Sequence, residues 1–215
     1  MSIEFESVAC YLCGEETDVR RLGRLQAQGP SDLDGRPGPP LRTAICDEVQ
    51  RCSTCGFCSP DLGSSPGLPR EQARQLLETP GYQGQLVNPR LNSAANNNLC
   101  WALICREARR YEAAGQAVLR AAWLCDDGGA VQAARWCRER ALELYLQAPS
   151  LPTVQAMQVE LLRRLGRFEG ARTTNESLLK QRLPAELSRA ARLQKVLIQN
   201  QDSGSASVAT GSNAR

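Results

Sequence analysis

The chain has 215 residues, of which 42% are hydrophobic and 23% are charged, and its formal net charge is +3. That length allows one core, or a small domain beside a larger one, and no apolar run approaches the ~18 residues of a membrane span. The first residues also lack the basic and apolar segments of a secretory signal. We therefore expect a soluble, cytoplasmic protein with no membrane partner, in which ten cysteines indicate metal ligands before disulfides.

The first region, residues 1–62, is rich in Cys, Gly, Pro and Asp. Short apolar alternations at Thr43-Ala44-Ile45 and Glu48-Val49-Gln50 predict short strands between turns. The region holds six Arg and ten acidic residues, whereas residues 63–200 hold nineteen Lys or Arg and twelve acidic residues. A metal module that binds nucleic acid should be basic, because it neutralises phosphates. Nucleic acid is therefore a possible but less favoured partner, and solvated helix faces explain the scattered Arg of the second region.

Two CxxCG motifs bracket the first region, and their cysteines are Cys10, Cys13, Cys52 and Cys55. A two-residue gap lets both sulfurs of a tight turn face one ion, and the following Gly permits the open backbone of such a knuckle. Because the chain has no His, the ligands would be thiolates, and four thiolates form a closed structural Zn²⁺ site. Metal binding contributes on the order of 10 kcal/mol to folding, which a module of ~60 residues needs. The alternative is four unrelated buried thiols.

Cys58 extends the second motif to Cys52-x2-Cys55-x2-Cys58, which resembles part of an iron–sulfur ligand run. The fourth ligand and the Pro spacing of a ferredoxin are missing, so an iron–sulfur or redox protein is the weaker alternative. We expect Cys46 and Cys58 to be unliganded, although the sequence leaves their participation open. Free Cys is among the most buried residue types, so the helical region's thiols are predicted core residues: Cys100, Cys105, Cys125 and Cys137.

A breaker-dense linker, residues 63–69, precedes a helical region at 70–200. Gly and Pro positions predict helices at 70–78, 92–109, 112–125, 130–148, 153–165, 169–182 and 185–199. Gly166 lies five residues before Ala171, and Ala134 precedes Ala171 by 37 residues, close to the tetratricopeptide period of ~34. Repeat-like antiparallel helix pairs are therefore favoured over a generic bundle. The small, polar residues 201–215 are predicted to be a disordered tail.

Three segments resemble one bacterial family. They are the first CxxCG knuckle, Ser31-Asp32-Leu33-Asp34-Gly35-Arg36-Pro37, and Val49-Gln50-Arg51-Cys52-Ser53-Thr54-Cys55-Gly56-Phe57-Cys58-Ser59-Pro60-Asp61. Over roughly residues 8–200 the chain resembles the uncharacterised family called domain of unknown function 2225, whose matching elements read DLDxRP and CPxCGY. The resemblance implies a zinc-ribbon head and a tetratricopeptide-like body without an established activity. Tyr11 and Ser53 stand where the family often has Pro, and neither change removes a ligand.

The loop between the knuckles has two interpretations. Asp32, Asp34 and Arg36 can contact a charged group of a partner, or they can serve the loop itself. In the second case the Asp side chains cap the turn, Gly35 permits it and Arg36 neutralises a neighbour. The local role is favoured, and a partner contact is retained as a hypothesis.

The sequence predicts a small β-rich zinc ribbon followed by an all-α domain, acting as a non-enzymatic scaffold for a protein or peptide. Without His there is no imidazole base, and no base is evident for a Ser or Cys nucleophile. Stacked helix pairs form concave surfaces suited to such partners. A nucleic-acid-associated protein and an iron–sulfur or redox protein are the alternatives.

Overall fold

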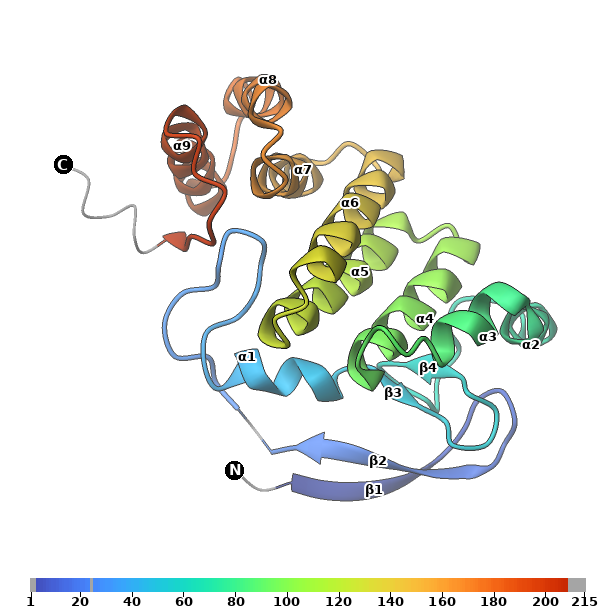
Figure 1. Ribbon diagram of the computed structural model, residues 1–215. Helices are drawn as coiled ribbons and strands as arrows, with labels where there is room; N and C mark the ends of the chain where they lie inside the picture. Colours follow the sequence, from blue (N-terminus) through green and yellow to red (C-terminus); the bar gives the residue numbers. More distant parts are fainter. Residues whose placement is uncertain (1–2, 24, 209–215) are drawn as a thin grey trace.

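The computed structural model describes residues 3–23 and 25–208, and it is mostly helical with two small antiparallel strand pairs (Figure 1). The strands are β1 (Ile3–Ala9), β2 (Glu16–Leu22), β3 (Gln50–Arg51) and β4 (Cys58–Ser59), and β1 pairs with β2 and β3 with β4. A short helix, α1 (Leu41–Ala44), and a 3₁₀ turn, η1 (Ile45–Asp47), lie between them. The predicted combination of a strand-containing head and a helical body is confirmed at this level.

The body consists of helices packed mainly on their sequence neighbours. They are α2 (Arg70–Glu78), α3 (Pro80–Leu86), α4 (Ser93–Glu107), α5 (Tyr111–Asp127), α6 (Val131–Gln147), α7 (Pro152–Arg164), α8 (Phe168–Leu179) and α9 (Ala185–Gln199). Every helix in the described part of the chain is too short or too polar to cross a membrane.

The strand predicted at Thr43-Ala44-Ile45 is wrong, since these residues form the end of α1 and the start of η1. Pro40 stands at the N-cap of α1, where a residue without a donor N–H loses no helical hydrogen bond. The Thr43 hydroxyl donates to the Pro40 carbonyl at 2.8 Å, a local bond that competes with strand pairing. Of the second predicted strand, Glu48-Val49-Gln50, only Gln50 lies in a strand, where it is the first residue of β3.

Helix α3 was not predicted, because Pro80-Gly81 was interpreted as the end of the preceding helix. Pro instead stands at the first helical position, where it is favoured. The Thr79 hydroxyl accepts a hydrogen bond from the backbone N–H of Tyr82 at 3.3 Å and caps the new helix. The breaker pair therefore turns the chain between two helices.

A single hydrophobic core joins the head to the body. It extends from Leu12 in the first knuckle through Phe57 to buried residues of α4, α5 and α6, and it ends in α7. The predicted linker belongs to this packing, since Leu68 is buried and the Pro66 carbonyl accepts a hydrogen bond from Arg110 at 3.1 Å. Helices α7, α8 and α9 enclose a second, smaller core. Residues of the head, the 63–69 segment and the body therefore pack in one core.

The predicted disorder of residues 201–215 is wrong for residues 201–208, and residues 209–215 lie outside the described part of the chain. Arg163, fully buried in α7, donates to the carbonyls of Asp202 and Gly204 at 2.5 and 2.9 Å. The Leu33 N–H donates to the Ala206 carbonyl at 2.8 Å. A buried guanidinium needs acceptors for its donors, and this segment supplies two of them as it passes between α9 and the loop before α1 (Figure 1).

Candidate metal centre

The two CxxCG motifs fold into knuckles of the same geometry, one at the end of each strand pair. In the first, the N–H of Cys10 donates to the Glu15 carbonyl at 2.9 Å and that of Gly14 to the Cys10 carbonyl at 2.8 Å. The second knuckle repeats both bonds: the N–H of Cys52 donates to the Phe57 carbonyl at 2.8 Å, and the N–H of Gly56 donates to the Cys52 carbonyl at 3.0 Å. Gly14 and Gly56 have φ of 84° and 76°, the left-handed region that favours glycine. The following Gly is thus required by the turn.

The four cysteine sulfurs of the knuckles converge on one point. Cys10 Sγ lies 3.7 Å from Cys55 Sγ, Cys13 Sγ lies 3.7 Å from Cys52 Sγ, and all four sulfurs lie within 4.8 Å of one another. A tetrahedral ion with metal–sulfur bonds of about 2.3 Å has sulfurs about 3.8 Å apart. The predicted ligands are therefore brought together at a spacing that can hold a single metal ion.

The surroundings of Cys10, Cys52 and Cys55 shift the pKa values of these thiols in different directions. Burial raises the pKa of Cys10 and of Cys55. For Cys52, burial also opposes ionisation, but hydrogen bonds from the Cys55 backbone and from the Thr17 hydroxyl prevail and lower its pKa to about 6. Thr17 Oγ1 lies 3.4 Å from Cys52 Sγ and is itself buried in β2. This hydroxyl stabilises the Cys52 thiolate from outside the cluster of four sulfurs.

Helix α2 is attached to the first knuckle. The Arg74 guanidinium donates to the Leu12 carbonyl at 2.6 and 3.2 Å, between the two cysteines of the motif. The Arg70 guanidinium lies 4.8 Å from the centre of the Tyr11 ring, within the range of a cation–π contact. The first knuckle is therefore fixed to the start of the helical body.

Helix α3 is attached to the second knuckle through Tyr82. The Tyr82 hydroxyl donates to the Gly56 carbonyl at 3.0 Å and accepts from the Cys58 N–H at 3.1 Å, and the residue is fully buried. A methyl group on Gly56 would approach the Leu86 side chain to 2.8 Å, so α3 packs directly on the knuckle. The cysteine cluster is thus attached to both α2 and α3.

The other cysteines stand outside the ligand set. Cys46 is exposed, and its thiol donates to the Thr43 carbonyl at 3.2 Å. Cys58 is buried against α4, and a hydrogen bond from Cys100 lowers its pKa. The predicted core thiols are all buried: Cys100, Cys105, Cys125 and Cys137. Among the described residues, the four knuckle cysteines are the one group of possible metal ligands that clusters.

The charged residues of the 31–37 loop have partners within the chain. Asp34 Oδ2 accepts the indole N–H of Trp123 at 2.7 Å, and both residues are buried. Arg36 donates to both carboxylate oxygens of Asp127, at 2.5 and 2.6 Å, and Arg42 donates to Asp32 at 2.6 Å. These contacts join the loop to α5, whereas the sequence analysis expected the partners of Asp34 and Arg36 within the loop itself. The Asp34–Trp123 and Arg36–Asp127 contacts join residues 89 and 91 positions apart, a separation that no local motif encodes.

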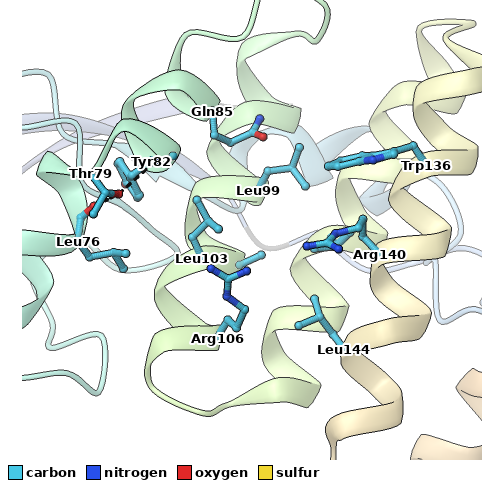
Figure 2. A pocket seen from close by; sticks show the side chains of 13 residues that line it. Leu76, Thr79, Tyr82, Gln85, Leu99, Leu103, Arg106, Trp136, Arg140 and Leu144 are labelled. Atoms are coloured by element: carbon cyan, nitrogen blue, oxygen red, sulfur yellow. Dashed lines mark hydrogen bonds between the residues drawn. The ribbon is translucent and has the colours of Figure 1, made fainter.

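A hollow of about 450 Å³ lies over α4, with α2 and α3 on one side and α6 on the other (Figure 2). We call it the Trp136 hollow. Its apolar surface includes Leu99 and Leu103, and Trp136 on α6 is 47% exposed beside them. Figure 2 shows the guanidinium groups of Arg106 and Arg140 directed toward the space between α4 and α6. This hollow was not predicted from the sequence, where its one signal is an aromatic residue on the polar face of the 130–148 helix.

Comparison with known proteins gives no family, curated protein or solved structure that matches this chain.

Proposed function

We propose that this chain is a non-enzymatic interaction scaffold in which a structural Zn²⁺ ion, bound by the four knuckle cysteines, holds one wall of a peptide-docking hollow. The observation that carries the proposal is the position of Tyr82. It binds the second knuckle through its hydroxyl and lines the Trp136 hollow as part of α3. Metal site and hollow are thus two sides of one short helix.

The choice of zinc rests on ligand chemistry and space. Sulfurs 3.7 to 4.8 Å apart leave room for one ion, whereas an iron–sulfur cluster has to fit several irons and sulfides between its ligands. Zn²⁺ favours four thiolates in tetrahedral geometry, and such a site is closed to water and substrate. The ion therefore acts in folding and not in catalysis. The two knuckles form the zinc-ribbon head that the sequence predicts.

The choice of a protein or peptide partner rests on the apolar character of the hollow. A nucleic-acid site would need a continuous basic surface for phosphates, but the walls here are mainly Leu, Val, Ala and aromatic side chains. Exposed aromatic and aliphatic groups in a concave site are typical of protein interaction surfaces. In this view α4, α5 and α6 form tetratricopeptide-like pairs whose inner face lies at the hollow.

Site-specific photo-crosslinking in the cell of origin tests this function. A photoreactive amino acid at exposed Gln132, beside Trp136, should yield adducts with defined peptide segments of a partner. A matched probe at exposed Gln199, the last residue of α9, should not yield them. Trp136→Ala should abolish the Gln132 adducts without changing the melting temperature. Identical adducts from both probes, or adducts that survive Trp136→Ala, would refute a docking site at the hollow.

A further inference from the structure

The walls of the Trp136 hollow are basic as well as apolar. Arg106 and Arg140 are its charged lining residues, and it has no acidic one. A second hollow of about 700 Å³ shares Trp136 as a wall, and its one charged lining residue is Arg90. Three guanidinium groups therefore line the two mainly apolar hollows, and carboxylates are absent from the lining that the structure describes.

The guanidinium groups keep donors free for a ligand. Within the described residues, the Arg90 and Arg106 side chains have no carboxylate partner. Arg140 pairs with Glu143 at 2.6 Å, but both side chains are about half exposed, so solvent screens this pair. A guanidinium has five N–H donors, and Arg140 therefore retains donors for a second acceptor.

The dimensions suit a short peptide segment. Ala133, Trp136, Arg140 and Leu144 lie along one side of α6 and line the two hollows. The eleven steps from Ala133 to Leu144 rise about 16 Å, so the two hollows together are long enough for several consecutive side chains of a bound segment. Large apolar side chains would fill the hollows on either side of Trp136, and carboxylates would meet the arginines at the rim.

We propose that the two hollows bind an acidic peptide segment that carries large apolar side chains. This inference rests on the proposed docking function and adds the chemistry of the ligand. Bidentate carboxylate contacts by arginine supply direction and specificity, while burial of apolar side chains around Trp136 supplies affinity. The apolar surface favours such a segment over nucleic acid, whose phosphates would use the arginines and leave the hollows empty.

A peptide-display selection tests the proposal. A library of random 15-residue peptides is selected on the full chain, and enriched peptides are measured against Trp136→Ala, against Arg106→Glu/Arg140→Glu, and against Arg172→Glu/Arg192→Glu. The last pair is a matched control with the same change of net charge on exposed positions of α8 and α9. Circular dichroism of every variant checks that it is folded.

We expect enriched peptides to be net negative and to contain at least two large apolar residues. Their affinity should fall at least tenfold with Trp136→Ala and with Arg106→Glu/Arg140→Glu, and less than twofold with the control pair. Neutral or basic peptides that depend on Trp136 would overturn the acidic specificity and leave the docking function in place. Peptides whose affinity does not change with Trp136→Ala would overturn both the acidic specificity and the docking function. A 20-nucleotide single-stranded RNA that binds through Arg106 and Arg140, with no Trp136-dependent peptide, would assign the arginines to phosphate.

Discussion

Asp34 accepts the indole N–H of Trp123 at 2.7 Å, and this buried bond holds the loop between the knuckles against helix α5. Because the two residues are 89 positions apart, the bond closes a large part of the chain. Asp34 Oδ1 also accepts the Arg36 N–H at 3.2 Å and so closes the turn itself.

Asp34→Ala should lower the free energy of unfolding by about 1–3 kcal/mol, because the buried indole N–H loses its acceptor. Urea denaturation monitored by circular dichroism measures this loss. Asp18→Ala, which changes an exposed Asp in β2, should cost less than about 0.5 kcal/mol. Equal losses in the two variants would show that the Asp34–Trp123 bond contributes nothing to stability.

Cys52→Ser should abolish stoichiometric zinc binding and lower the melting temperature, because a three-thiolate site is open and the second knuckle keeps a single ligand. Cys46→Ser is the matched control, since Cys46 is exposed and outside the cluster. It should retain the metal and the melting temperature of the original chain. Metal analysis and differential scanning fluorimetry check both variants, and retention of zinc by Cys52→Ser would contradict the ligand assignment.

Gly115→Ala should destabilise the α5–α6 pair, because the new methyl group would approach the Tyr145 ring to 2.9 Å. Overpacking of this kind costs about 1–3 kcal/mol. Gly84→Ala, in α3, meets no atom within 4 Å and should stabilise the protein by about 0.5–1 kcal/mol through helix propensity. Thermal unfolding of the two variants should shift in opposite directions. Similar shifts would show that α5 and α6 do not require close approach at this position.

Arg163→Ala should lower the free energy of unfolding by about 3–5 kcal/mol, because it leaves the Glu160 carboxylate buried without its cation. Arg172→Ala removes a comparable pair with Glu169 on the surface and should cost less than about 1 kcal/mol. Amide hydrogen exchange should also become faster at residues 202–207 in Arg163→Ala, since the acceptors of Asp202 and Gly204 lose their donor. Unchanged exchange there would contradict the role of Arg163 in holding this segment.

The loss of stability caused by Arg163→Ala should depend on pH. Burial raises the pKa of Glu160, and Arg163 acts in the opposite direction. Without Arg163 the folded state binds a proton that the unfolded state releases, so the stability of the variant rises as pH falls through the raised pKa. The difference between the original chain and the variant should therefore shrink as the pH falls from 7.5 toward the ordinary pKa of a glutamate. Urea denaturation at several pH values measures it, and a constant difference would exclude protonation of Glu160.

The cysteine cluster was predictable because its signal is local. In each CxxCG motif the spacing of the two cysteines and the following Gly lie within five residues. These features are sufficient to form the knuckle. The main helices were also predictable, since breakers such as Pro149 and Gly166 stand between apolar periodic segments. The boundary errors arose where one residue serves two elements, as Thr79 does when it ends α2 and caps α3.

The remaining contacts could not be predicted because they join distant segments. No pattern near Arg163 indicates that residues 202–204 supply its acceptors, and no pattern near Tyr82 indicates that it binds the second knuckle. The Trp136 hollow likewise depends on the placement of α3 beside α4, and α3 was absent from the predicted helices. Local sequence specified the elements and the clustered cysteines, whereas tertiary packing created the Trp136 hollow.

In the proposed metal centre, four thiolates from the two knuckles share one zinc ion. Native mass spectrometry of the purified chain, combined with elemental analysis, measures this stoichiometry. We expect one zinc per chain, lost on unfolding in acid and absent from Cys52→Ser. A folded chain that carries no metal, or one that carries iron with inorganic sulfide, would contradict it.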